Sequence, residues 1–392
     1  MKNYRAQLEV SRDDLIQWRR DFHQHPELAF EEIRTAGIVA KELQELGVEV
    51  QTGIGKTGVV GILDGAHDGP TVLVRCDMDA LPVEEENETN YISQTSGKMH
   101  ACGHDGHTAI ALAVARTLHQ NRQNLHGRVK FVFQPAEEVG LGANAMIEDG
   151  VLQTPAPDVC LGLHLWNELP VGEIAVPTGP SMAGAGRFTL RIRGRGGHAA
   201  MPHQTADPVM ALVHTISAMQ TIVSRNVDPT EAVVISTTQL AGSHAYNIIP
   251  DEASCVGTVR TFTQSVTELV IERMTEIAES TAQAAGCKAD FTFEQLTLPV
   301  NNNGDIAERL AKGFAAAMPD ISVHPTFRTM AAEDVAFFLD QVPGVYMMVG
   351  SANPERGLDY PHHHPKFDFD EEALLIGASA LTSAIAEYVL PD

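Results

Sequence analysis

The sequence predicts an α/β protein in which a mainly parallel mixed sheet is flanked by helices and a ferredoxin-like α+β domain is inserted. Three observations support this fold class. Short β-rich runs alternate with helical runs as far as Pro180, the order then changes to β-α-β-β-α-β, and helix, strand and helix return from Asp305 onward. A chain of 392 residues is also longer than one hydrophobic core usually supports. We therefore expect a larger domain at 1–183 and 296–392 and a smaller one at 184–295.

The larger domain should begin with two helices, because apolar residues recur at helical spacing between Arg12 and Leu46, with a break near Pro26. Two strands, a helix and a third strand follow, at 59–63, 71–81, 109–120 and 127–135. Strands that alternate with helices predict a parallel sheet, and such sheets bind ligands beyond the carboxyl ends of their strands. We therefore look for a functional site in the loops after these strands.

The inserted domain is predicted from a change in the order of predicted strands and helices after Pro180. The run at 188–194 alternates polar and apolar residues as a half-exposed strand does. A helix, two strands and a second helix then follow, at 207–223, 232–242, 254–262 and 266–286. This order is the split βαβ pattern of ferredoxin-like domains.

Composition excludes several classes of protein. Residues A, V, I, L, M, F, W, Y and C make up 44% of the chain and charged residues 20%, so the chain is not intrinsically disordered. The formal charge of −24 repels phosphate backbones and anionic lipids, so we expect neither a nucleic-acid nor a membrane partner. The first residues lack an apolar signal-peptide core, which predicts a cytoplasmic location. Five scattered cysteines without a C-x-x-C pair indicate neither a disulfide framework nor a zinc ribbon.

Common single motifs fail in context. GIGKTG at 53–58 precedes a strand instead of opening a helix, and Val50 stands where a P-loop needs glycine, so we expect a turn there. No G-x-S-x-G and no H-E-x-x-H segment occurs. The chemistry must therefore come from residues that the fold brings together.

Five clusters of metal-binding residue types remain, most of them at predicted strand ends. They are DMDALP (77–82), CGHD (102–105), QPAEE (134–138), GLHLWN (162–167) and HHHPKFDFDE (362–371). In QPAEE, Pro135 ends the strand, so the adjacent glutamates lie on irregular backbone and point in different directions. One can bind a cation while the other faces a water that the cation binds, which is what a metal hydrolase needs.

Each cluster alone has an ordinary structural explanation. Two adjacent glutamates are usually solvated surface residues, and a lone cysteine or histidine is usually a packed core residue. Cys102 and His104 are two residues apart, so on an extended loop both would reach one metal centre. His164 could equally be structural, and spacing cannot choose among His362, His363 and His364. The coincidence of the clusters is what favours a metal site.

The motifs together resemble the M20 metallopeptidase family, in its amidohydrolase branch of hippurate, auxin-conjugate and N-acyl-amino-acid hydrolases. Those that carry the resemblance, in order, are DMDALP, HACGHDGH, FQPAEE, GLHLW, GGHAAMPH, NIIPDE, AAEDVAFF and HHHPKFDFDE, and they extend over nearly the whole chain. The resemblance implies two divalent ions per subunit in the larger domain, Zn²⁺ or Mn²⁺, with Co²⁺ or Ni²⁺ also suitable. It also implies that the smaller domain is a lid that mediates assembly into a homodimer or higher homo-oligomer.

By this resemblance Cys102 bridges the two ions. Glu138 and His363 would complete the coordination of one ion, and His104 and His164 would complete that of the other.

Two carboxylates have implied roles beside the ligands. Glu137 would be the general base that later passes its proton to the leaving amine, and Asp79 would orient a ligand by hydrogen bonding. Without the resemblance, Asp79 could be read as a strand-end capping residue.

The lid would supply further site residues. The resemblance implies that His198 stabilises the oxyanion, often across the dimer interface, and that Glu333 lies near the substrate. Asn247 and Arg260 could recognise the substrate carboxylate. A surface salt bridge for Arg260 and helix N-terminal acidity for Glu333 are the structural alternatives.

The implied activity is that of an aminoacylase-type amidohydrolase, which cleaves the amide bond of small N-acyl-L-amino acids such as N-acetyl or N-benzoyl conjugates with metal-activated water. A deacetylase of the N-acetyl-diaminopimelate type and a dipeptidase are alternatives with the same metal core. A thiol hydrolase, with Cys102 activated by His104 or His107, is a rival mechanism. A protein that binds ligand or metal without catalysis is the third reading.

Overall fold

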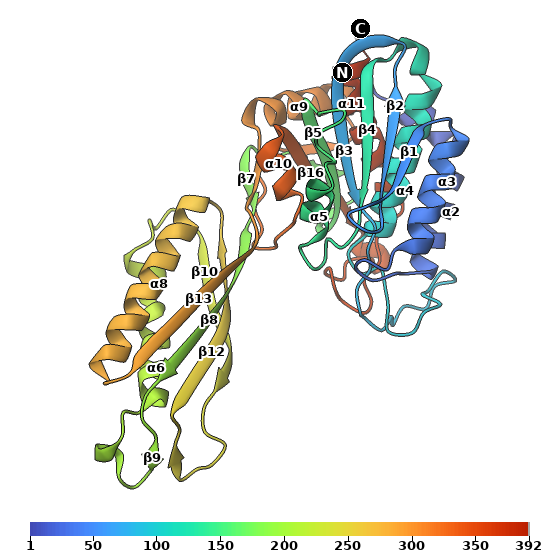
Figure 1. Ribbon diagram of the computed structural model, residues 1–392. Helices are drawn as coiled ribbons and strands as arrows, with labels where there is room; N and C mark the ends of the chain where they lie inside the picture. Colours follow the sequence, from blue (N-terminus) through green and yellow to red (C-terminus); the bar gives the residue numbers. More distant parts are fainter. Residues whose placement is uncertain (391–392) are drawn as a thin grey trace. The chain divides into compact units, whose positions relative to one another are not determined.

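The structure is a computed structural model that describes residues 1–390, and the chain folds into two compact units. Unit 1 comprises Met1–Ser181, Asn301–Arg328 and the chain from Asp334 onward. Unit 2 comprises Met182–Val300 and Thr329–Glu333. The domain boundaries at 183/184 and 295/296 remain predictions. Figure 1 shows the elements of each unit.

Unit 1 is built on an eight-stranded mixed sheet with the order β1-β2-β4-β3-β5-β16-β6-β15. The strands are β1 (Glu49–Ile54), β2 (Gly58–Asp64), β3 (His67–Asp77), β4 (His126–Gln134), β5 (Val159–Pro170), β6 (Glu173–Ala175), β15 (Ser322–His324) and β16 (Gly344–Ala352). The four central strands β4, β3, β5 and β16 are parallel to their neighbours within that group. GIGKTG forms the end of β1 and the tight turn into β2, as predicted.

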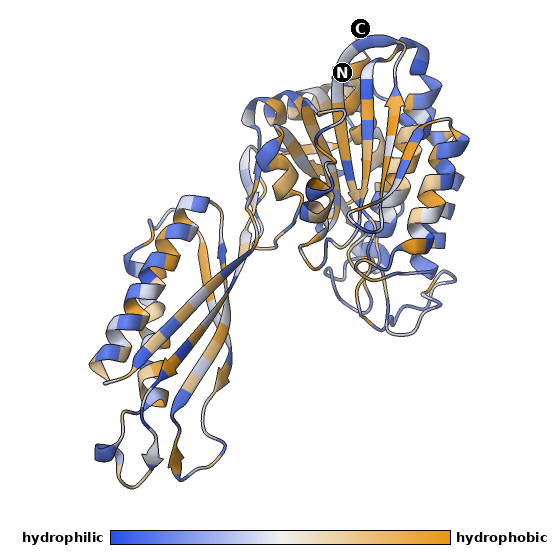
Figure 2. Ribbon diagram, viewed as in Figure 1, coloured by the Kyte–Doolittle hydropathy of each residue, from blue (hydrophilic) through white to orange (hydrophobic). Residues whose placement is uncertain are grey.

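Helices flank this sheet. They are α1 (Arg5–Glu9), α2 (Arg12–Gln24), α3 (Ile33–Glu45), α4 (His104–Gln120), α5 (Gly142–Glu148), α9 (Gly304–Ala317), α10 (Ala336–Gln341) and α11 (Glu372–Val389), with 3₁₀ turns at 122–124 and 354–356. α4 and α11 pack against each other and on the central strands, whereas α5 and α10 pack together beside β4. Figure 2 shows apolar residues concentrated in the strands and in α11. This arrangement confirms the predicted fold class.

The pleat of the central strands separates an apolar face from a polar one. Leu161, Leu163 and Leu165 of β5 belong to the core that α4 and α11 cover. Because successive side chains of a strand alternate, His164 points to the opposite face. On β3, Arg75 and Asp77 are likewise outside that core although both are fully buried. The sheet therefore carries a buried polar row that leads to the carboxyl end of β3.

α11 is long and apolar enough to cross a membrane, but 83% of its apolar window is buried inside the protein. Its residues Leu374, Leu381 and Ile385 are members of the unit 1 core. This helix is therefore explained as the central core helix of unit 1.

Unit 2 is a four-stranded antiparallel sheet with the order β10-β12-β8-β13 and two long helices, which agrees with the ferredoxin-like prediction. Its elements are β8 (Gly184–Arg193), β9 (Gly197–His198), α6 (Pro208–Met219), α7 (Thr221–Arg225), β10 (Val233–Ala241), β11 (Ile248–Ile249), β12 (Glu252–Thr261), α8 (Gln264–Ala284) and β13 (Lys288–Thr297), with a 3₁₀ turn at 202–204. β9 and β11 pair as a separate short ribbon. β7 (Gly179–Met182) and β14 (Val300–Asn302) pair where the chain passes between the units.

Two local predictions were wrong. The segment 102–104 is not an extended loop, because Gly103 adopts a left-handed conformation with φ of +90° and α4 begins at His104 instead of near residue 109. His164 does not lie at a strand end but in the middle of β5. Both errors concern the backbone from which these side chains reach the site.

Candidate metal centre

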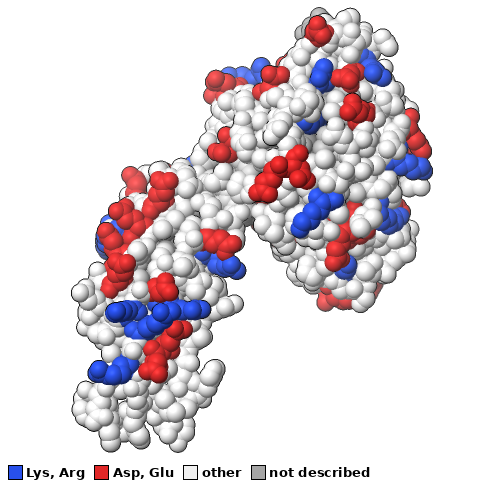
Figure 3. Space-filling model, in the orientation of Figure 1, with Lys and Arg blue, Asp and Glu red and all other residues white. Residues whose placement is uncertain are grey.

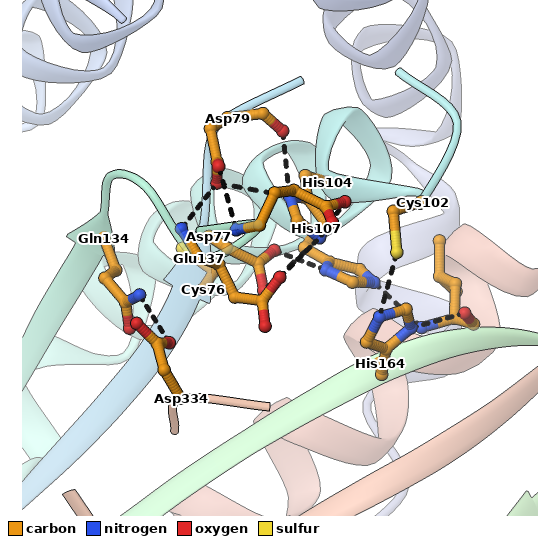
Figure 4. A network of polar contacts seen from close by, with 12 residues as sticks. Cys76, Asp77, Asp79, Cys102, His104, His107, Gln134, Glu137, His164 and Asp334 are labelled. Carbon is orange, nitrogen blue, oxygen red and sulfur yellow. Dashed lines mark hydrogen bonds and ion pairs between the residues drawn. The ribbon is translucent and has the colours of Figure 1, made fainter. Parts of the chain in front are cut away.

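The site forms where β3, β4 and α4 meet. β3 ends at Asp77 and β4 at Gln134, and these two residues are partners in the parallel register. The loops that follow therefore leave the sheet at the same edge. α4 begins there as well, with His104 as its first residue. Figure 4 shows that Asp79, His104 and Glu137 lie together, with Cys102 and His164 facing each other beside them.

Two groups of three ligand atoms share the Cys102 thiol. In one group Cys102 is joined by His104 and His164, and in the other by Glu138 and His363. Within each group the candidate atoms all lie within 4.8 Å of one another. The structure thus brings together all five side chains expected to bind metal, in the two sets that the family resemblance implied.

The buried histidines of these groups both present Nε2 to the cluster. His104 Nδ1 donates to the backbone oxygen of Asp79 at 2.8 Å, and His164 Nδ1 donates to the backbone oxygen of Leu165 at 2.6 Å. A carbonyl can only accept, so the neutral rings carry their proton on Nδ1 and keep a lone pair on Nε2. His164 Nε2 lies 3.6 Å from Cys102 Sγ. These tautomers are the ones that metal-ligating histidines need.

Two buried atoms at the centre lack a hydrogen-bond partner within residues 1–390, namely His104 Nε2 and Glu138 Oε1. They are 3.8 Å apart, too far for a hydrogen bond. Buried polar atoms are nearly always satisfied, so such atoms facing each other call for an explanation. Cations bound one to the carboxylate oxygen and one to the imidazole lone pair would satisfy both atoms, so the donors present fit metal ions.

The charges of the cluster also favour a bound cation. Burial opposes protonation of His104, yet the carboxylates of Asp77, Asp79 and Glu138 outweigh it and raise its pKa to about 10. Burial raises the pKa of Glu138 to about 7. The protein has therefore gathered more negative charge than it neutralises, and added positive charge would stabilise the cluster.

The three C-terminal histidines are distinguished by geometry. His363 Nε2 lies 3.4 Å from Glu138 Oε2. His362 Nε2 instead donates to the backbone oxygen of Leu165 at 3.0 Å, and its ring packs against Trp166. The ring of His364 stacks on Tyr360. Backbone with a φ of +66° at His363 accompanies this divergence of neighbouring rings.

The loop that carries the two glutamates is held by Asp79. Its Oδ1 accepts the backbone N–H of Glu137 and its Oδ2 that of Glu138, both at 3.0 Å. Because Asp79 is 1% exposed, these bonds are shielded from water. Asp79 thus orients the loop of the glutamates through its carboxylate and His104 through its backbone oxygen.

A buried network behind the site was missed by sequence reasoning. Arg75 donates to Asp77 at 2.6 Å, and the other oxygen of Asp77 lies 2.6 Å from His107 Nδ1. His107 Nε2 accepts the backbone N–H of Leu165 at 2.9 Å, which leaves the proton on Nδ1. Asp334 completes the network by accepting from Arg75 at 3.0 Å. A single arginine inside the apolar run TVLVRCD was the only sequence signal for it.

This network bears on the role of His107. Both of its ring nitrogens are engaged, one with Asp77 and one with the Leu165 backbone. The geometry therefore gives His107 the function of a brace between β3 and β5. It disfavours His107 as the base that would activate Cys102.

Two of the expected lid residues lie side by side in unit 2. The backbone oxygen of Asn247 accepts the N–H of Ala199 at 3.1 Å, next to His198. His198 Nδ1 accepts the N–H of Ala200 at 3.1 Å, so its neutral ring carries the proton on Nε2, and the residue is exposed. An exposed N–H donor of this kind is able to bind a developing negative charge.

Arg260 lies elsewhere in unit 2. It is half-buried near the end of β12, where its guanidinium bonds Thr258 Oγ1 and the backbone oxygen of Val259. The β9–β11 ribbon adjoins the opposite end of β12, at Glu252. A strand rise of about 3.4 Å per residue places the two ends roughly 27 Å apart.

Glu333 is 1% exposed and directly precedes Asp334. It lies before α10, whose first residue is Ala336. Its burial is unlike that of a solvated acid at a helix N-terminus.

Comparison with known proteins adds four findings. Residues 73–387 match the model of a family described as peptidase family M20/M25/M40. An N-acetylcysteine deacetylase of Bacillus subtilis (strain 168) is 38% identical over 377 residues, covering 96% of this chain and 97% of the relative. The IAA-amino acid hydrolase ILR1-like 5 of Arabidopsis thaliana is 37% identical over 389 residues, covering 97% of this chain and 89% of the relative. The crystal structure of the Bacillus subtilis YXEP protein, a dinuclear metal binding peptidase from the M20 family, has a TM-score of 0.85 at 34% identity and covers 96% of this chain and 99% of that one.

Proposed function

The chain belongs to peptidase family M20/M25/M40 and is a hydrolase of amide C–N bonds, and from this premise we propose that it hydrolyses N-acyl-L-amino acids with two bound divalent ions. The observation that carries the proposal is the pair of three-residue groups that share Cys102. Cys102, His104 and His164 would hold one ion, and Cys102, Glu138 and His363 would hold the other. Thiolate and imidazole donors favour Zn²⁺, and the carboxylate also suits Mn²⁺.

Glu137 is the proposed general base. When bound, the ions would polarise the acyl carbonyl and lower the pKa of a water toward about 7. The Glu137 carboxylate would accept that water's proton as the C–O bond forms, and would return it to the amine nitrogen as the C–N bond breaks. Asp79 supports this role by fixing the Glu137 backbone. Glu137 Oε2 lies 3.9 Å from His104 Nε2, and this short distance to a proposed ligand supports the proposal.

We propose that His198 and Asn247 act on a substrate bound by a second copy of the chain. A small N-acyl amino acid cannot reach both ends of β12, so one subunit's His198 and Arg260 would not contact the same molecule. His198 would donate from Nε2 to the oxyanion, while Asn247 and Arg260 would recognise the substrate carboxylate and Glu333 would line the pocket. This division predicts a homodimer, or a higher oligomer, formed through the lid.

The surface of unit 2 supports assembly through the lid. Large apolar side chains exposed there are Met201, Met210, Val213, Leu240, Tyr246, Ile248 and Leu296. Several lie on or near the β9–β11 ribbon, and Figure 3 shows no Lys, Arg, Asp or Glu at that tip on the face in view. Exposed apolar patches of this kind mark protein interfaces.

The location we propose is the cytoplasm. All five cysteines are buried and none forms a disulfide, which suits a reducing compartment.

The test is a panel of N-acyl amino acids in which the acyl and amino halves vary separately, including N-acetyl-diaminopimelate and dipeptides, assayed with protein loaded with Zn²⁺ or Mn²⁺. Glu137→Gln and Glu137→Ala should lose turnover while retaining metal. Glu148→Gln, which alters an exposed glutamate of α5, is the matched control and should keep full activity. Unchanged turnover in both Glu137 variants would show that Glu137 is not the general base.

Two other outcomes separate the rival readings. Activity that survives removal of the metal by a chelator would favour Cys102 as a nucleophile. A fully loaded wild-type protein that hydrolyses no member of the panel would favour a protein that binds ligands without catalysis.

A further inference from the structure

We propose that Glu32 is a positioning residue that holds the Glu137–Glu138 loop and thereby tunes one of the two metal positions. Glu32 is fully buried and lies outside every motif that pointed to the site. Its Oε1 accepts the backbone N–H of Ala136 at 2.9 Å and that of Phe30 at 3.0 Å. Its Oε2 accepts the hydroxyl of Thr57. The inference rests on the proposed function, since it assigns Glu32 a part in the same site.

The backbone at these contacts explains why a hydrogen-bond acceptor is needed at this position. Ala136 has a φ of +54° and Phe30 a φ of +62°, so both are non-glycine residues in the left-handed region. That conformation is unfavourable for a residue with a Cβ and persists only where surrounding contacts impose it. One oxygen of Glu32 binds the N–H of both strained residues. Glu32 therefore fixes two turns with a single atom.

The turn at Ala136 decides where the glutamates point. Three consecutive residues donate their backbone N–H groups to carboxylate oxygens. Ala136 donates to Glu32, and Glu137 and Glu138 donate to Asp79. Fixing three successive peptide planes also fixes the directions of the Cα–Cβ bonds between them. Without Glu32 the N–H of Ala136 loses its acceptor, and the left-handed turn after Pro135 is held only through the Ala136 carbonyl, which accepts from Leu141 and Gly142.

The consequence should be unequal for the two ions. Glu138 belongs to the group with Cys102 and His363, whereas the group with His104 and His164 contains no residue of this loop. Loosening the loop should weaken the first position and spare the second. It should also slow the reaction without weakening substrate binding, because Glu137 moves with the same loop.

Three substitutions separate the contributions of Glu32. Glu32→Ala removes both oxygens. Glu32→Gln keeps an acceptor for the two N–H groups, and its amide can donate to the Thr57 hydroxyl, so it should rescue. Glu32→Asp keeps the charge but shortens the side chain by one methylene, so it withdraws the oxygens from Ala136 and perturbs folding less than Ala does.

Glu27→Ala is the matched control. The Glu27 carboxylate also accepts two backbone N–H groups, those of Arg34 and Thr35 at 2.9 and 2.8 Å. These bonds hold the start of α3 and do not touch the metal loop. Glu27→Ala should cost stability while leaving both ion affinities and kcat unchanged.

The experiment is a titration of metal-free protein with Zn²⁺ against a competing chelator, which resolves two affinities, together with kcat and KM on the best substrate of the panel. For Glu32→Ala we expect one affinity to fall about 10- to 100-fold, and kcat to fall by a similar factor with KM within about 2-fold, as is typical when a residue that orients a ligand is lost. Glu32→Asp should show the same pattern with smaller changes, and Glu32→Gln should behave as the wild type.

Equal weakening of both ions in Glu32→Ala and Glu32→Asp, or wild-type values for both variants, would overturn the inference. So would a Glu32→Gln protein as impaired as Glu32→Ala. The metal titration needs no substrate, so a wild-type protein that hydrolyses nothing refutes the proposed function without deciding the role of Glu32. An active wild type whose Glu32→Ala variant matches Glu27→Ala refutes only the role of Glu32.

Discussion

Replacement of Arg75 by methionine should destabilise unit 1 far more than loss of an exposed ion pair does. Arg75 is 1% exposed, and its guanidinium lies 2.6 Å from Asp77, 3.0 Å from Asp334 and 2.8 Å from Gln134 Oε1. Methionine fills much of the same volume but leaves both carboxylates buried without their cation. Breaking a buried ion pair by removing one partner costs about 3–5 kcal/mol. Asp77 keeps His107 and Asp334 keeps Gln134, so we expect the lower end, about 3 kcal/mol.

Guanidinium chloride unfolding followed by tryptophan fluorescence measures the free energy of unfolding of unit 1. Trp18 and Trp166 are the two tryptophans of the chain, and both belong to unit 1. Arg20→Met is the matched control, because Arg20 bonds both oxygens of Glu371 but its side chain is 40% exposed. The free energy of unfolding should fall by about 1 kcal/mol or less in that variant. An Arg75→Met protein within 1 kcal/mol of Arg20→Met would refute the reasoning that the buried cation neutralises this network.

Two further predictions concern the residues around the site. Asp79→Asn leaves one acceptor for two backbone N–H groups. A charge-assisted hydrogen bond is worth about 1.5–3 kcal/mol, so its loss should lower kcat by about 10- to 150-fold at full metal loading, as measured by steady-state kinetics. An unchanged kcat would show that Asp79 does not orient the loop. Burial opposes protonation of His23, but its bonds to Asp105 and Glu85 raise its pKa to about 9. Because this folded-state pKa exceeds the ordinary 6.5, the stabilisation is complete below pH 6.5 and is lost as pH rises toward 9. The free energy of unfolding should therefore fall by an amount on the order of 3 kcal/mol between these two pH values, as measured by unfolding curves, and His23→Gln should abolish this fall. An equal fall in the variant would contradict the prediction.

The sequence was informative wherever a local pattern has one physical meaning. Pro135 ends β4 because proline cannot continue the ladder, so the glutamates after it were correctly expected on irregular backbone. Alternating polar and apolar residues correctly predicted β8 of unit 2. The family resemblance named the five residues that the fold brings together, and the relatives confirm the family.

Features that depend on the tertiary structure could not be predicted. The helix start at His104 depends on a left-handed Gly103, and the segment CGHD alone does not distinguish that from an extended loop. Arg75 and Asp334 are 259 positions apart, so no spacing links them. The orientation of His363 depends on its positive φ, a property that residue type does not specify. Glu32 was missed because a glutamate before a helix is normally read as a surface residue.

The way the carboxylates are satisfied indicates which of them remain for a cation. At the edge of the sheet, Asp77 is neutralised by Arg75 and bonded by His107, and Asp334 accepts from Arg75 and Gln134. Asp79 and Glu32 instead bind backbone N–H groups. Glu138 differs, since its buried Oε1 has no hydrogen-bond partner within the described chain.

This contrast gives the division of labour in the site a physical basis. A carboxylate whose oxygens are occupied by the chain cannot approach a metal without breaking those bonds, which costs about 1–3 kcal/mol for each buried group left unsatisfied. Glu138 Oε1 and His104 Nε2 have no such bond to break, so a cation bound at either atom gains the full interaction with it. The same argument predicts that Asp77, although it is near His104, does not become a ligand. Its two oxygens are held by Arg75 and His107, and the position of the metal is thereby restricted to the side of Cys102 and Glu138.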